Sequence, residues 1–393
     1  MINWMGGWPK VSLLSGTVWE ERLSGVVAGV RQGRLPPGVA GREAEIRARL
    51  QARLGERVLG ASSSVSVLAL TSGADEALSR LLLALTEPGD TVLVDRLVAR
   101  PALHLFRRMA VRMFAVPGDE RGMDPEALLL ALLREKPALV YAAPSCPDPS
   151  GRSWDDERRR ALVNLCEWAG VPLVRDDRQA MLASADGALD PRRDGGTAVY
   201  SIGQLPPGLF PGLRLGWIAS VTSGAGPDAA RDAATAKGGA RALTRGSLPL
   251  DRLPAGRQAA LLEAAVQEVA LRWLEDPQSA EHLGAFRERC RTRMRMFLQA
   301  MGKANIRGCH WIEPDGGMHV WVRLPGGLEG EALLRTAWRK GLLFQPGSGF
   351  FASVPERNAI RVTPVHTAEE RLAEGVRRLE EAVAEWTGRW AWI

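Results

Sequence analysis

Residues 64–85 read SVSVLALTSGADEALSRLLLAL, and this stretch decides the class of fold. Its first half is rich in β-branched and apolar residues and ends at Gly73, which predicts a buried strand and a tight turn. Its second half carries apolar residues at helical spacing, which predicts a helix directly after the turn. The stretch is therefore the first strand-and-helix unit of an α/β fold.

The same alternation continues along the chain. Further strands are predicted where short apolar runs are bounded by turn residues, and helices fill the intervals between them. These runs are TVLVD (91–95), VRMFAVP (111–117), ALVYAAP (138–144), VPLVRDD (171–177), TAVYSI (197–202) and LRLGWIAS (213–220). The pattern predicts a mostly parallel sheet flanked by helices, with functional groups at the carboxyl ends of its strands.

Three regions are expected. Residues 1–40, with Trp scattered among Gly and Pro, form an N-terminal arm, and residues 41–282 form the large α/β domain. The segment HWIEPDGGMHVWVRLP (310–325) reads as two strands around a glycine turn, and a strand and a terminal helix follow. Residues 283–393 are therefore predicted to form a smaller C-terminal α+β domain.

The composition of the 393 residues excludes several classes of function. Hydrophobic residues make up 46% and charged residues 24%, which is typical of a folded globular protein. The 51 basic and 45 acidic residues are interleaved and leave a formal net charge of only +6, so we expect no binding to nucleic acid. No apolar stretch is long enough to span a membrane and no signal peptide is visible, so we expect a cytoplasmic protein.

The four cysteines lie far apart in the chain, with no Cys-x-x-Cys pair and no histidine at zinc-ligand spacing. We therefore expect reduced, partly buried thiols and no metal site.

Several motifs follow one another in a specific order. Thr71-Ser72-Gly73 opens a helix, whose free N–H groups and dipole suit a phosphate. Downstream come YAAPSCPDPSG (141–151), a strand ending in Asp176-Asp177, FPGLRLGWIAS (210–220), PDGGMHVWVRLP (314–325) and NAIRVT (358–363). Taken together, these motifs resemble the class I and II aminotransferases of the fold-type I pyridoxal-phosphate (PLP) superfamily, especially the aminotransferase-like domain of MocR-type regulators.

The resemblance runs from about residue 60 to residue 385 and implies the fold-type I architecture, a PLP cofactor and a homodimer. It also implies roles for single residues. Ser72, Gly73 and Arg214 match the phosphate-binding positions, Asp177 the acid that pairs with the pyridine nitrogen, and Arg361 the arginine that clamps the α-carboxylate of a substrate.

This chain departs from the family pattern at the residue that carries the chemistry. PLP enzymes of this family need a lysine amine, which here corresponds to Pro207 when counted back from Gly212, or to Pro206 when counted forward from Tyr200. All five lysines lie outside this loop: Lys10, Lys136, Lys237, Lys303 and Lys340.

Other cofactor contacts are changed as well. The asparagine of the family's Asn-Pro-x-Gly motif is Asp148, and the tyrosine expected three residues after Asp177 is Ala180. In the phosphate cup, Asp75 and Gln204 replace residues that would bind the phosphate. The resemblance implies PLP, but these losses predict that the chain binds it weakly or does not bind it.

The sequence leaves two main functions open. The first is a non-catalytic or repurposed scaffold that binds a small carboxylate or amino-acid ligand, or a protein partner. The second is a PLP-dependent amino-acid aminotransferase with a non-standard site. A regulator acting directly on DNA is not expected, because about forty residues before the main domain are too few for a winged-helix module; a regulator acting through another protein belongs with the first reading.

Overall fold

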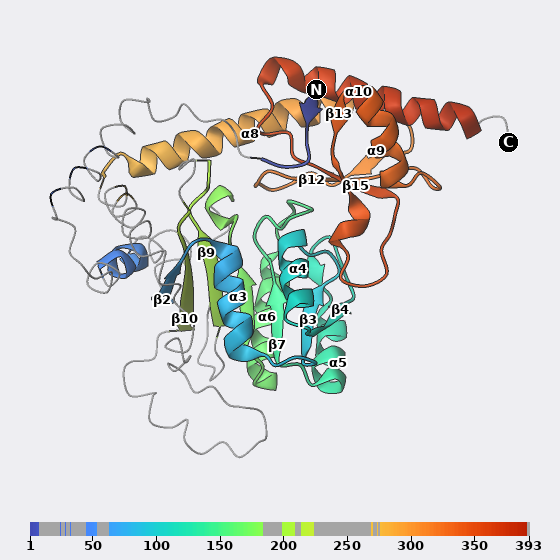
Figure 1. The fold of residues 1–393 in the computed structure, drawn as a ribbon. Helices are drawn as coiled ribbons and strands as arrows, with labels where there is room; N and C mark the ends of the chain where they lie inside the picture. The colour runs from blue at the N-terminus through green and yellow to red at the C-terminus, as the bar shows by residue number, and fades with distance from the viewer. Residues whose placement is uncertain are drawn as a thin grey trace, which may run out of the picture.

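A computed structural model describes residues 1–7, 45–52, 63–183, 199–208, 214–223 and 276–390, together with the single residues 24, 28, 32, 269 and 273. Two larger sheets organise these residues: a seven-stranded sheet in the first part of the chain and a four-stranded sheet in the last part (Figure 1).

The seven-stranded sheet is mostly parallel, as predicted. In spatial order its strands are β2 (Ser63–Thr71), β10 (Gly216–Ser223), β9 (Val199–Gln204), β8 (Leu173–Asp176), β7 (Leu139–Ala142), β3 (Thr91–Asp95) and β4 (Arg112–Val116). Strand β10 runs antiparallel to both of its neighbours, and the five strands from β9 to β4 are parallel to one another. The parallel strands therefore end on the same side of the sheet, where binding sites of α/β folds form.

Helices cover both faces of this sheet, as Figure 1 shows. Helices α3 (Ala74–Leu85) and α4 (Arg100–Arg108) pack their apolar residues against one face, where Phe106 meets Tyr141 edge to face at 5.2 Å. Helices α5 (Pro125–Glu135) and α6 (Asp156–Ala169) cover the other face. The side chains of Asp124 and Asp155 cap these two helices by accepting bonds from backbone N–H groups three residues on.

The C-terminal sheet has the order β11 (His310–Trp311), β12 (Val320–Arg323), β15 (Ala359–Val362) and β14 (Gln345–Pro346). Three helices accompany it, namely α8 (Ser279–Lys303), α9 (Gly330–Arg339) and α10 (Glu369–Trp390). The shorter elements are β1 (Ile2–Asn3), β5 (Gly118–Asp119), β6 (Gly122–Met123), β13 (Leu342–Leu343), and the 3₁₀ turns η1 (Ala180–Leu182) and η5 (Gly347–Phe350).

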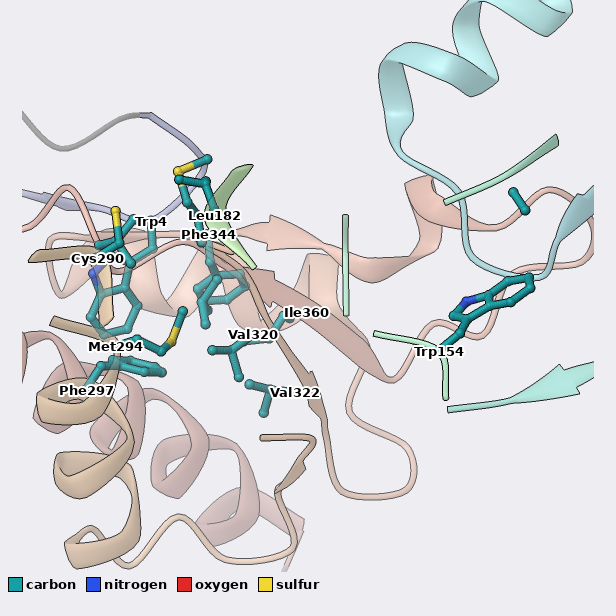
Figure 2. Close-up of a cluster of buried hydrophobic side chains, with 14 of the residues drawn as sticks. Trp4, Trp154, Leu182, Cys290, Met294, Phe297, Val320, Val322, Phe344 and Ile360 are labelled. Atoms are coloured by element: carbon teal, nitrogen blue, oxygen red, sulfur yellow. The ribbon is translucent and has the colours of Figure 1, made fainter. Parts of the chain in front are cut away.

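The first residues of the predicted N-terminal arm pack on elements of the last part of the chain. Strand β1 pairs in parallel with β13, and the Trp4 side chain is fully buried. Its ring meets Phe297 of α8 edge to face at 5.2 Å, and its Nε1 donates to the Thr367 hydroxyl at 3.1 Å. Figure 2 shows Trp4 beside Phe297 and Met294 in this core. Most of the remaining arm, including Trp8 and Trp19, lies outside the described residues.

All four cysteines are buried and carry free thiols. Among the helices in the described part of the chain, none is long and apolar enough to cross a membrane.

Candidate functional site

The start of helix α3 is shaped by two glycines. Gly73, directly before the helix, has φ of 135°, a conformation that favours glycine. A β-carbon on Gly216 of β10 would lie 2.6 Å from the carbonyl carbon of Gly73, so no larger residue fits there. The two backbones therefore meet closely at the point where the first N–H groups of α3 have no partner within the helix.

Side chains of the protein itself bond to two backbone N–H groups at this turn, one on α3 and one just before it. The Ala74 N–H donates to Oε1 of Gln204, at the end of β9, at 3.2 Å. The Ser72 N–H donates to Oε2 of Glu76 at 2.7 Å, and the Ser72 hydroxyl bonds to the same carboxylate. Burial opposes ionisation of Glu76, but the bonds from Ser72 and the positive charge of Arg80 bring its pKa below the usual value. A carboxylate and an amide oxygen therefore occupy the start of α3.

An arginine links this turn to the end of strand β8. The Nε of Arg178 donates to both carboxylate oxygens of Asp176, at 2.9 and 2.8 Å. Its terminal nitrogen donates to Oδ1 of Asp75, in the first turn of α3, at 2.6 Å. Burial would lower the pKa of Arg178, but Asp176 and its other anionic neighbours raise it well above the usual value. Arg178 is therefore a fixed cation between β8 and α3.

Asp176 receives a further hydrogen bond from strand β7. The hydroxyl of Tyr141 donates to Oδ2 of Asp176 at 2.6 Å. Burial and the charge of Asp176 raise the pKa of Tyr141 well above its usual value, so the phenol keeps its proton and remains a donor. Tyr141, Asp176, Arg178 and Asp75 thus form one continuous chain of polar contacts.

Asp177 has different partners. Its Oδ2 accepts from Arg175 and from the Ser201 hydroxyl, both at 2.6 Å, while its Oδ1 is buried and has no hydrogen-bond partner among the described residues. The carboxylate that connects to the start of α3 is therefore Asp176, whereas Asp177 bonds along strands β8 and β9.

Pro206 and Pro207, one of which the resemblance aligns with the family's lysine, lie just after the end of strand β9. The preceding residue, Leu205, donates its N–H to the Leu215 carbonyl at 2.9 Å, which holds the loop against the start of β10. Pro206 is buried and Pro207 is partly exposed. Both prolines therefore lie on the side of the sheet where Gln204 reaches Ala74.

The described lysines lie on helix ends and not on this loop. Lys136 follows α5, Lys303 ends α8, and Lys340 follows α9 and pairs with Glu385 at 3.2 Å. Lys10 and Lys237 lie outside the described residues.

Arg214 lies just before strand β10, whose first residue, Gly216, is paired with both Thr71 and Gln204. Its side chain is exposed, and within the described ranges no ion pair involves it. Arg214 is therefore an exposed cation two residues before the strand end that lies beside the start of α3.

Arg361, on β15, is buried and bonds inward. Its terminal nitrogen donates to the Thr363 hydroxyl at 2.6 Å, and its Nε lies 3.4 Å from Oδ1 of Asp148. Its guanidinium lies over the ring of Phe350, 5.2 Å from the ring centre. Burial lowers the pKa of Arg361, and the charge of Asp148 opposes this. Asp148, which the resemblance aligns with the asparagine of the family motif, is thus the counter-ion of Arg361.

His319 completes this second cluster as a neutral base. Because a guanidinium can only donate, Nδ1 of His319 must accept the 2.9 Å bond from Arg361. Its Nε2 faces Asp148 at 3.9 Å. Burial lowers the pKa of His319 to about 4, Asp148 opposes the shift and Arg361 adds to it, so the ring is uncharged at neutral pH.

The structure thus places the sequence-predicted residues in separate parts of the molecule. Ser72 and Gly73 lie at the start of α3, and Arg214 lies two residues before Gly216, whose backbone approaches Gly73. Asp177 bonds with its neighbours on the central sheet, and Arg361 bonds within the C-terminal sheet and to the loop after β7.

Sequence reasoning missed Arg178. The available signal was an arginine directly after the two aspartates at the end of strand β8, because a buried acid is usually paired with a cation. The partner on α3, a hundred residues away in the chain, has no such signal in the sequence.

Comparison with known proteins places this geometry in a family. A family model described as "Aminotransferase class I and II" matches residues 42–379. The chain is 27% identical to aromatic-amino-acid aminotransferase 1 of Thermococcus litoralis, over 80% of this chain and 72% of the relative. It is 28% identical to 2-aminoadipate transaminase of Thermus thermophilus, over 80% of this chain and 74% of the relative. It is also 24% identical to the uncharacterised HTH-type transcriptional regulator YdfD of Bacillus subtilis, over 85% of this chain and 64% of that protein.

Solved structures agree on the fold. The multiple substrate aminotransferase from Thermococcus profundus superposes with a TM-score of 0.80 at 22% identity, covering 99% of this chain and 92% of that one. The kynurenine aminotransferase of Pyrococcus horikoshii gives 0.77 at 24% identity, covering 98% and 91%. These likenesses confirm the predicted fold-type I architecture, and with the family match they show that the chain belongs to the class I and II aminotransferases.

Proposed function

We propose that this chain is a non-catalytic member of the aminotransferase family, which holds no PLP as a Schiff base and binds a small carboxylate ligand. The observation that carries the proposal is the Arg178 bridge, because the chain uses its own cation to neutralise Asp176 and Asp75 on the side of the sheet where the family binds its cofactor. Two acids on this side of the sheet are therefore already bonded to a cation of the chain itself.

The start of α3 does not fit a phosphate dianion. A phosphate would have to displace Gln204 from the Ala74 N–H, and it would lie beside the carboxylates of Asp75 and Glu76. Like charges about 4 Å apart repel by about 1 kcal/mol even in bulk water, and by more near a protein surface. Arg214 is the residue of the described ranges that offers an exposed positive charge near this turn to oppose this.

The loop after β9 does not fit the covalent part of the chemistry. PLP, when bound in this family, supplies an electron sink, and a lysine amine must first attach to it and then move protons. Pro206 and Pro207 have no amine. We therefore assign no catalytic step to this site.

The carboxylate ligand is supported by the inherited position of Arg361, but this arginine has an internal partner. A ligand carboxylate could reach Arg361 only by displacing Asp148, which lies 3.4 Å from its Nε. The fold therefore favours a ligand held by another cation, or a protein partner bound on the outside.

A working PLP-dependent aminotransferase is the second candidate. It is favoured by Arg214, which is exposed beside the start of α3. Such an enzyme would hold PLP without an aldimine from the loop after β9.

We also propose that the protein is a cytoplasmic homodimer. The free, buried thiols suit a reducing compartment, and the fold is one whose family members pair. A single-subunit mass in light scattering would contradict the dimer.

The test of the main proposal is a PLP titration followed by borohydride reduction and intact-mass measurement. We expect no added phosphopyridoxyl mass and no visible aldimine band. The 2-aminoadipate transaminase from Thermus thermophilus, whose solved structure holds N-(5'-phosphopyridoxyl)-L-leucine, is the positive control. A phosphopyridoxyl group fixed on one specific lysine would overturn the proposal and establish the second candidate.

A further inference from the structure

A cleft lies between the two sheets, away from the contacts described above. Its empty space is about 500 Å³ including the open mouth. On one side it is lined by residues that follow β3, by the β5–β6 hairpin and by the loop at 147–154, and on the other by residues of β12 and the segment before it. The cleft therefore opens beyond the carboxyl end of β3, where α/β folds bind ligands.

Two tryptophans give this cleft an apolar wall. Trp154 packs so tightly on Gly122 that a β-carbon there would lie 2.2 Å from the ring. Trp321 comes from β12 and meets Phe350 edge to face at 5.9 Å. Because Phe350 in turn lies under Arg361, Trp321 stands between the cleft and the Arg361 cluster.

Most charged groups at the cleft already have partners. Asp119 pairs with Arg121 and Arg158. Arg152 pairs with Asp315 at 2.8 Å, and Arg96 pairs with Glu356 at 2.6 Å. These pairs form the rim and leave little charge for a ligand.

Asp95 and Arg323 are the two inner exceptions. Asp95, the last residue of β3, accepts the Arg96 N–H at 2.6 Å, but within the described ranges no cationic side chain forms an ion pair with it. Burial raises the pKa of Asp95 to about 7, although the backbone bonds and Arg96 oppose the shift. A cationic ligand would stabilise the ionised form of a desolvated carboxyl of this kind in a cleft.

Arg323 lies on the opposite wall, on the same face of β12 as Trp321, because side chains two residues apart in a strand point the same way. It is exposed, and no carboxylate of the described residues pairs with it. Glu120, on the exposed rim, also has no ion pair among the described residues. The inner part of the cleft therefore offers one carboxyl, Asp95, at the end of β3 and one cation, Arg323, on the C-terminal sheet.

We propose that this cleft binds a small amino acid as a zwitterion, with its ammonium group on Asp95 and its carboxylate on Arg323. The ligand's apolar carbons lie along Trp154 and Trp321. The inference deepens the proposed function and rests on it, since it names the carboxylate ligand of the scaffold and locates it at Arg323 and not at Arg361.

The experiment is isothermal titration of the full-length protein, prepared without PLP, with L-leucine and with γ-aminobutyrate. The two probes carry the same charged groups at different spacing. Leucinamide, which lacks the carboxylate, and N-acetyl-L-leucine, which lacks the ammonium group, are the chemical controls. We expect millimolar or tighter binding of at least one amino acid and of neither control.

Variants locate the site. Arg323→Gln and Asp95→Asn are expected to weaken binding at least about tenfold, since each removes one charge-assisted contact of about 1.4 kcal/mol or more. Arg152→Gln is the matched control, because this arginine lines the same cleft but already pairs with Asp315, and it should bind like the wild type. A thermal melt of each variant checks that it is folded.

Three results would overturn the inference: no binding of either amino acid to the wild type, binding unaffected by Arg323→Gln, or binding lost in Arg361→Gln but kept in Arg323→Gln. The outcome is separable from that of the proposed function. Phosphopyridoxyl attachment together with Arg323-dependent binding would remove the proposed function and keep the cleft. No phosphopyridoxyl attachment together with no Arg323-dependent binding would keep the proposed function and remove the cleft.

Discussion

Oδ1 of Asp148 lies 3.4 Å from the Nε of Arg361, so an acid on the loop after β7 neutralises a cation on the C-terminal sheet. Both side chains are largely buried, and this pair joins the two parts of the molecule. Their contact makes the stability of the packing between the loop after β7 and the C-terminal sheet depend on the charge of Asp148.

Asp148→Asn should therefore destabilise the protein by about 3 kcal/mol, because it leaves Arg361 buried without a counter-ion. Urea unfolding measures the change. The control is Asp315→Asn, which breaks the exposed pair with Arg152 and should cost less than about 1 kcal/mol. Equal effects of the two substitutions would mean that the Asp148 pair is no more important than a surface contact.

The two acids that Arg178 bridges, Asp176 and Asp75, should differ in how much their contacts with it contribute to stability. Arg178→Ala leaves Asp176 buried with Tyr141 as its remaining side-chain partner, and we expect a loss of about 3–5 kcal/mol. Asp75→Asn removes only the exposed end of the bridge, so the loss should stay below about 1 kcal/mol. A small effect of Arg178→Ala in denaturant titration would show that the bridge is not a fixed part of the fold.

His319 should make the protein sensitive to acid. Its pKa falls from about 6.5 in the unfolded chain to about 4 in the fold, where it faces Arg361, Thr363 and Asp148. Between these two values the unfolded chain binds a proton that the folded chain does not, so stability falls as pH decreases from 6.5 to 4.

His319→Gln should remove this part of the pH dependence. The measurement is the melting temperature of wild type and variant in parallel from neutral to acidic pH. Parallel curves would indicate that His319 is charged in the folded protein or that it titrates alike in both states.

The titration of Asp95 should change stability with pH in the opposite direction to that of His319. Its pKa is about 7 in the fold and about 3.8 in the unfolded chain, so the folded chain keeps a proton that the unfolded chain loses between these values. Stability contributed by the protonated form is therefore lost as pH rises from 4 to 7.

Asp95→Asn keeps the shape but removes the titration, so the variant should melt higher than the wild type at pH 8 and by a smaller margin at pH 5. Glu120→Gln, which removes an exposed carboxyl at the same cleft, is the control and should leave the curve unchanged. A constant difference between wild type and Asp95→Asn across this range would contradict the shift.

The fold could be predicted from the sequence because its signals are local. In residues 64–85 the change from strand to helical spacing lies within one short segment, and the structure has β2 and α3 there. The short strands β1, β13 and β14 were not predicted, since two residues give no periodicity and each strand exists only through its partner.

The sequence predicted where the candidate site residues lie in the secondary structure, but not which side chains they contact. The motif around Arg361 gave its place on a strand, yet its bonds to Thr363, His319 and Asp148 depend on how loops from two sheets meet. The cleft residues Asp95 and Arg323 belong to ordinary strand ends in the sequence. Only the packing of one sheet against the other brings them to a common space.

The hydrogen bond from Trp4 to Thr367 joins residues 363 positions apart. During synthesis on the ribosome, Trp4 emerges first, and its binding partner exists only after the intervening residues have been made. Contacts of such separation form late and slow the completion of a fold. Until then an indole that ends fully buried is exposed, so nascent chains stalled before Thr367 should be recognised by chaperones, and release of the complete chain should end that recognition.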